Sequence, residues 1–94
     1  MILKQQRAAV HGLAQRIASV RTSYDIEVIS RHAESIYNIA ARHERRLSDN
    51  IMTRRRHQRC PQRMSWVAER MQWKLIQDDC RLIVEIAEGV RNEP

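Results

Sequence analysis

Apolar residues in the first fifth of the chain recur at the spacing of one amphipathic helix. Leu3, Val10, Leu13, Ile17 and Val20 are separated by intervals of seven, three and four residues. These intervals place the five side chains on one face of an α-helix. We therefore predict a first helix over residues 2–20, which at this length spans about 28 Å.

A longer and more regular apolar stripe follows, and it predicts a second helix over residues 23–57. Thr22 or Ser23 is suited to cap its start, and Asp25 follows Thr22 at the spacing of a capping box with the shorter acid. The stripe repeats at alternating intervals of three and four, the heptad spacing of a helix packed on a neighbour. Packing is expected to end near Ile51, because Arg54 takes the next position of the stripe. Its members are Ile26, Ile29, Ala33, Ile36, Ala40, His43 and Leu47.

Pro61 marks the second break in the chain. It moves Cys60 away from helical geometry and itself suits a first helical turn, so we predict a third helix over residues 61–90. Between residues 80 and 90 the apolar arc exceeds half of the helix circumference, which is typical of a helix that contacts two neighbours. The apolar residues form two stripes: Met64, Ala68, Met71, Leu75, Leu82 and Ile86 on one side, and Trp66, Trp73, Cys80 and Ala87 on another.

Together the three segments predict an all-α fold, a single-domain three-helix antiparallel bundle. Short connections make consecutive helices antiparallel neighbours. The second and third helices, at about 45 and 43 Å, are much longer than the first. The end of the second helix and the start of the third are therefore expected to form a two-helix arm. Trp66 and Trp73 lie on this arm beyond the reach of the first helix, so they either pack against the second helix or a second copy of the chain, or serve as anchors for a partner.

The charge of the chain is concentrated at the tip of the predicted arm. Residues 42–63 contain eight arginines against Glu44 and Asp49, and this difference equals the whole net charge of +6. A local excess of positive charge indicates an anionic partner more strongly than a diffuse one does. The candidate contact residues are Arg42, Arg45, Arg46, Arg54, Arg55, Arg56, Arg59, Arg63 and Arg70, together with Trp66 and Trp73.

Three functional hypotheses follow from this pattern. In the first, a small basic protein contacts nucleic acid, or docks as an accessory or inhibitor on a protein that handles nucleic acid. In the second, the chain is a helical adaptor that binds an acidic protein surface, with the tryptophans as anchors in the partner. In the third, it is a homodimer or larger homo-oligomer that pairs through the Trp66/Trp73 face. No helix-turn-helix, zinc-finger or RNA-recognition pattern supports reading of specific bases.

The sequence favours a non-enzymatic protein without metal or cofactor. His57 and Cys60 have a metal-like spacing, but structural zinc needs four ligands. Asp78 and Asp79 diverge by about 100° on a helix and do not form an acid–base pair. The opening segment turns polar at Lys4, and no apolar run approaches a membrane span. We therefore expect a soluble, cytoplasmic protein with no membrane contact.

Overall fold

The computed structural model describes residues 2–18, 23–53 and 63–91, and all three segments are helical. Helix α1 comprises Ile2–Ile17, α2 comprises Ser23–Thr53 and α3 comprises Arg63–Arg91. The described residues contain no strand, so the all-α prediction is confirmed. Val20, Arg54–Arg56, Arg59 and the predicted ends of the helices at residues 20, 57 and 61 lie outside the described residues.

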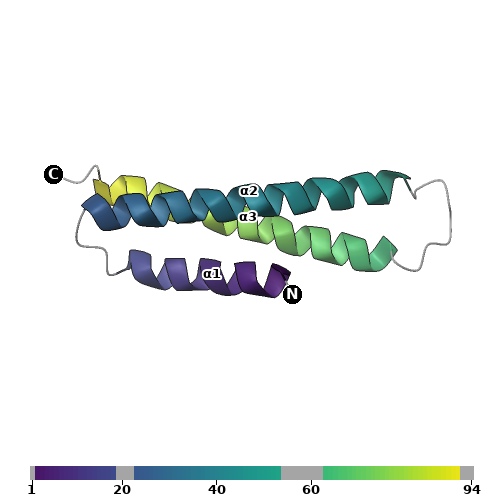
Figure 1. Ribbon diagram of the computed structural model, residues 1–94, viewed down its shortest axis with the longest axis horizontal. Coiled ribbons are helices and arrows are strands. Elements are labelled where there is room, and N and C mark those ends of the chain that lie inside the picture. The colour runs from purple at the N-terminus through teal and green to yellow at the C-terminus, as the bar shows by residue number, and fades with distance from the viewer. Residues whose placement is uncertain (1, 19–22, 54–62, 92–94) are drawn as a thin grey trace.

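The three helices lie side by side in an elongated arrangement (Figure 1). The Cα radius of gyration is 16.2 Å and the principal extents are 57 × 21 × 14 Å. A compact chain of this length has a radius of gyration of about 12 Å. The difference follows from helix length, because α2 and α3, at about 46 and 43 Å, run along nearly the whole molecule.

Helices α2 and α3 form an antiparallel pair, and α1 lies along only one half of it (Figure 1). That half contains the start of α2 and the end of α3. Polar contacts follow the same antiparallel order: Glu44 accepts a hydrogen bond from Arg70 at 3.1 Å, and Tyr37 accepts one from Arg81, also at 3.1 Å. Toward the other half of the molecule α2 and α3 continue without α1.

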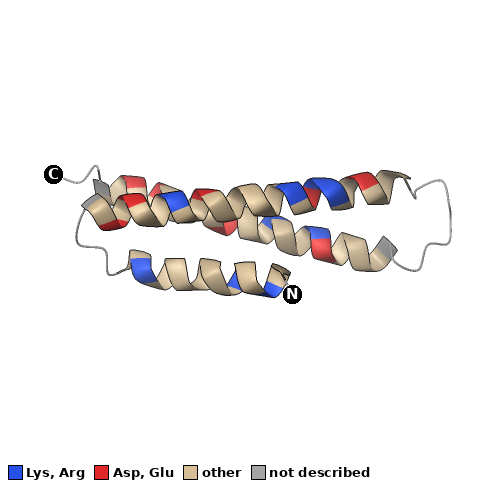
Figure 2. Ribbon diagram, in the orientation of Figure 1, with Lys and Arg blue, Asp and Glu red and all other residues tan. Residues whose placement is uncertain are grey.

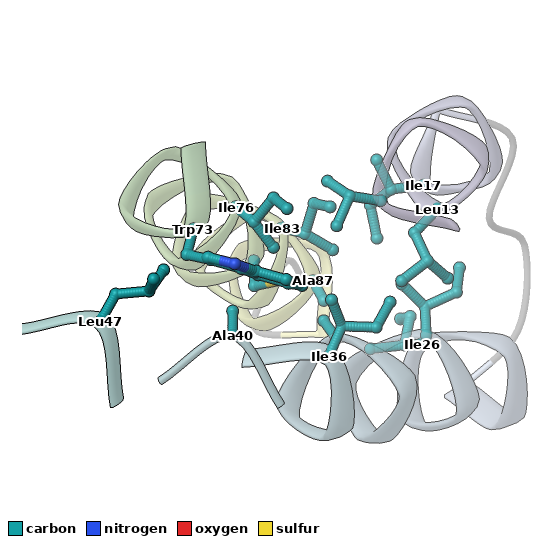
Figure 3. Packing of buried hydrophobic residues seen from close by; sticks show 14 residues of the cluster. Leu13, Ile17, Ile26, Ile36, Ala40, Leu47, Trp73, Ile76, Ile83 and Ala87 are labelled. Atoms are coloured by element: carbon teal, nitrogen blue, oxygen red, sulfur yellow. The ribbon is translucent and has the colours of Figure 1, made fainter. Parts of the chain in front are cut away.

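The heptad stripe of α2 faces the core, as its spacing predicts. Figure 3 shows side chains from all three helices converging on this stripe. His43 occupies the seventh position and is half-buried. The α2 residues that are buried are Ile26, Ile29, Ala33, Ile36, Ala40 and Leu47. From α1 the core receives Val10, Leu13 and Ile17.

Helix α3 turns its tryptophan stripe, not its methionine stripe, toward the core. Trp73 is only 2% exposed, and Trp66 is partly buried against the same cluster. Of the alternatives for Trp73, packing in the core is therefore the one observed, and its exposure as an anchor for a partner is not. Helix α2 contributes to the burial of Trp73, because His43 stacks on the indole and the small Ala40 leaves room for it between the helices. The other buried residues of α3 are Ile76, Cys80, Ile83 and Ala87.

The prediction that the end of α3 is covered by two neighbours holds for only part of its apolar arc. Cys80, Ile83 and Ala87 are buried, and burial raises the pKa of the Cys80 thiol to about 11. Leu82 and Ile86, however, are 54% and 43% exposed. Helix α1 packs on the side of Ile83 and leaves the side of Leu82 open, so the apolar arc of α3 is wider than the surface that its neighbours cover.

Candidate partner-binding surface

Three arginines lie on the outward face of the second half of α2. Arg42, Arg45 and Arg46 follow at intervals of three and one, which gathers their side chains within about a third of the helix circumference. All three are exposed. Figure 2 shows blue segments gathered in this part of α2, with red segments among them. We refer to Arg42, Arg45 and Arg46 as the arginine surface.

Acidic side chains neutralise little of the arginine surface. Glu44 is turned toward α3, where the Arg70 Nε donates to its Oε1 at 3.1 Å in a part-buried ion pair. Among the described residues, Arg42 and Arg45 have no ion-pair partner. By contrast, Arg31 in the first half of α2 is paired with Glu27 at 2.8 Å. The second half of α2 therefore presents three exposed guanidinium groups near one exposed carboxylate, that of Asp49, whereas Arg31 in the first half is paired with Glu27.

His43 connects the arginine surface to the core. Its ring stacks on the Trp73 indole with centroids 4.5 Å apart and planes inclined by 8°. Its Nδ1 lies 3.2 Å from the Arg46 guanidinium. Burial, with help from the positive charges of Arg46 and Arg42, lowers the pKa of His43, and Glu69 opposes the shift. A neutral His43 accepts a hydrogen bond from Arg46, which holds this guanidinium beside a shallow hollow lined by Arg42, His43 and Arg46.

The structure separates the residues that the sequence analysis grouped as one site. Arg42, Arg45 and Arg46 are together and exposed, whereas Arg70 is held in a part-buried ion pair with Glu44. Trp66 is half-buried, and Trp73 is in the core with its Nε1 unpaired. Trp73 could therefore contribute to a homodimer interface only if α2 and α3 separated. Arg54, Arg55, Arg56 and Arg59 lie outside the described residues, as does the side chain of Arg63.

A second surface was not singled out by the sequence analysis. A groove of about 790 Å³ runs between α1 and α3, with apolar walls and polar groups at its edge. On the α1 side it is bordered by Lys4, Arg7 and His11, and on the α3 side by Leu75 and Leu82 among others. The sequence does contain a signal for it, because residues 2–17 carry Lys4, Arg7 and Arg16 and no acid.

Comparison with protein-family models, with curated proteins and with solved structures gives no match for this chain. Within the three described segments, no group of three or more His, Cys, Asp or Glu side chains is placed to hold a metal ion. None of the described helices contains a stretch that is both long and apolar enough to cross a membrane.

Proposed function

We propose that this chain is a small, basic, non-enzymatic binding protein that contacts the phosphates of nucleic acid through the arginine surface. The observation that carries the proposal is the set of three exposed guanidinium groups on one helical face, where they outnumber the exposed carboxylate of Asp49, while Glu44 is already paired with Arg70. The planar guanidinium fork matches the oxygen atoms of a phosphate, so each arginine suits a backbone contact.

Two further features support a phosphate partner. Arg42, His43 and Arg46 line a hollow on the helix surface, which allows an anion to approach more than one donor at once. The run Arg54, Arg55, Arg56 follows in the sequence directly after α2. In this proposal, these arginines provide a basic tip at the end of a two-helix arm, which would suit contact with a phosphate backbone without selection of particular bases.

The test is a titration of labelled single-stranded and duplex oligonucleotides, followed by fluorescence anisotropy at about 50 and 200 mM salt. Replacement of Arg42, Arg45 and Arg46 by glutamine removes three phosphate contacts. The slope of log K against log salt should therefore become shallower by about 2–3 units. Affinity at the lower salt concentration should fall by more than about tenfold.

A matched control removes the same net charge elsewhere. Lys4, Arg7 and Arg31 are exposed and lie on α1 or in the first half of α2, so their replacement by glutamine should change the salt slope much less. Equal losses in the two triple variants would show that binding follows the net charge alone. Absence of binding to every oligonucleotide at the lower salt concentration would refute nucleic acid as the partner and would leave an acidic protein surface, as on a protein that handles nucleic acid.

A further inference from the structure

Helix α3 carries an exposed apolar stripe, interrupted by Asp78, on the side opposite to its buried tryptophan. Met64 is 77% exposed, Met71 61%, and Leu75 and Leu82 54% each, and Ile86 extends the stripe toward the end of the helix. We refer to these five residues as the outer stripe. It extends for about 33 Å along α3. Single exposed apolar residues are common on protein surfaces, but five large ones on one helical face indicate a contact surface.

The two halves of the outer stripe have different surroundings. Leu75, Leu82 and Ile86 line the groove between α1 and α3, whose other side includes the small residues Ala8 and Ala14. Met64 and Met71 do not line this groove, and they belong to the part of α3 that has no α1 beside it (Figure 1). One half of the stripe is thus the wall of a groove, and the other half is a projecting helical ridge.

We infer that two copies of this chain associate through the outer stripe, with their α3 helices antiparallel and a two-fold axis near Leu75. In this arrangement the projecting half of α3 from each copy, with Met64 and Met71, lies in the α1–α3 groove of the other copy. The surface is self-complementary, as a two-fold interface requires. The short α1 is what permits this, because a longer α1 would occupy the space that the second copy needs.

The charges along α3 select the antiparallel orientation. Residues 64–77 contain Arg70 and Lys74 against Glu69, a formal charge of +1. Residues 78–90 contain one base, Arg81, against four acids, a formal charge of −3. Antiparallel pairing sets the negative half of each helix beside the positive half of the other, whereas parallel pairing sets the two strongly negative halves against each other. Lys74 of one copy then lies within about one helical turn of Asp78 of the other.

The area of the outer stripe suits a dimer of moderate affinity. At about 100 Å² for each half-exposed side chain, the five residues offer roughly 500 Å² per copy, or about 1,000 Å² in the pair. The alanines of α1 and the stems of flanking side chains add to this area. The total is near the lower end of specific interfaces, so we expect dissociation in the micromolar range. The arginine surface lies on α2 and stays exposed, so the inference does not depend on the proposed function.

The first experiment is sedimentation velocity from about 1 to 100 µM, where the parent chain should pass from monomer to dimer. Leu82→Glu places one carboxylate in each half of the interface and should weaken association by at least about 100-fold. Met52→Glu makes a similar change at a residue of α2 that is 68% exposed, and it should leave association unchanged. Circular dichroism shows whether both variants remain helical. A parent chain that is monomeric throughout, or equal weakening by the two substitutions, overturns the inference.

The second experiment tests orientation. A spin label on Met64→Cys, with Cys60 replaced by serine and Cys80 buried, should give a distance between the two copies of about 33 Å, because each label is eleven positions from the two-fold axis. A label on Leu75→Cys should give a distance close to the spacing of adjacent helices, about 10 Å. Short distances at both sites indicate a parallel pair and overturn the antiparallel arrangement. Absence of any intermolecular distance overturns the dimer itself.

Discussion

The burial of Trp73 leads to a quantitative prediction about the stability of the α2–α3 pair. Trp73 is only 2% exposed and stacks on His43 at 4.5 Å. Truncation of a buried tryptophan to alanine costs about 3–5 kcal/mol. This cost includes about 0.5–1.5 kcal/mol for the aromatic pair. A chain of this length is typically stable by roughly 5–14 kcal/mol. Trp73→Ala should therefore remove a large fraction of the free energy of unfolding.

The unpaired Nε1 of Trp73 allows a sharper comparison. A buried donor without a partner costs about 1–3 kcal/mol. Trp73→Phe removes this donor and keeps an aromatic ring against His43, although it also removes part of the buried area. The two effects oppose each other, so Trp73→Phe should change the free energy of unfolding by less than about 1.5 kcal/mol. The free energy of unfolding of Trp73→Phe should therefore be close to that of the parent chain, and that of Trp73→Ala should be far lower.

Urea unfolding followed by circular dichroism measures this order. For Trp73→Ala the midpoint should fall by between about 1 and 4 M, depending on the slope of the transition. Met52→Ala is the control, because Met52 is 68% exposed and should cost less than about 0.5 kcal/mol. A loss at Trp73→Ala that equals the loss at Met52→Ala would refute the burial of the indole between α2 and α3. A large loss at Trp73→Phe would show that the lost buried area outweighs the removal of the unpaired donor.

Two other predictions concern single residues. Burial and the charges of Arg46 and Arg42 give His43 a pKa below its unfolded value of 6.5, so the folded chain binds fewer protons and the free energy of unfolding should fall as the pH falls from about 6.5 toward the folded pKa. His43→Gln should flatten this pH dependence, measured by urea unfolding between about pH 7 and 5. The control is His32→Gln, at an exposed site, which should leave the pH dependence as it is in the parent chain. An unchanged slope in both variants would contradict the role of His43. Gly12 is inside α1, and a Cβ at this position would meet no atom within 4 Å, so Gly12→Ala should raise the free energy of unfolding by about 0.5–1 kcal/mol. A lower midpoint of thermal unfolding for Gly12→Ala would show that another group packs against this face of α1.

Much of the fold follows from local patterns in the sequence. The stripe from Ile26 to Leu47 is one row at heptad spacing with charged residues around it, so it permits only one buried face. The same holds for Val10, Leu13 and Ile17 in α1. The arginine surface was also predictable, because Arg42, Arg45 and Arg46 lie opposite that stripe on the helix.

The placement of α3 did not follow from the sequence in this way. Its periodicity describes two apolar stripes, one with Trp73 and one with Leu75 and Leu82, and each has the spacing of a buried face. Periodicity depends on residues three or four positions apart within one helix. The choice between the stripes depends on what α2 presents, namely a small Ala40 and a flat His43 ring that leave room for an indole.

What the sequence determined by itself was therefore the set of helices, their antiparallel order and the location of the uncompensated positive charge, because each is a property of neighbouring residues or of connection length. What only the tertiary structure decided was the side of α3 that is buried, the withdrawal of Arg70 into an ion pair with Glu44, and the groove that α1 opens beside Leu82. These features depend on shape complementarity and charge pairing between residues far apart in the chain. Two faces of α3 are equally apolar, and the shape of the neighbouring helix decides which of them is buried.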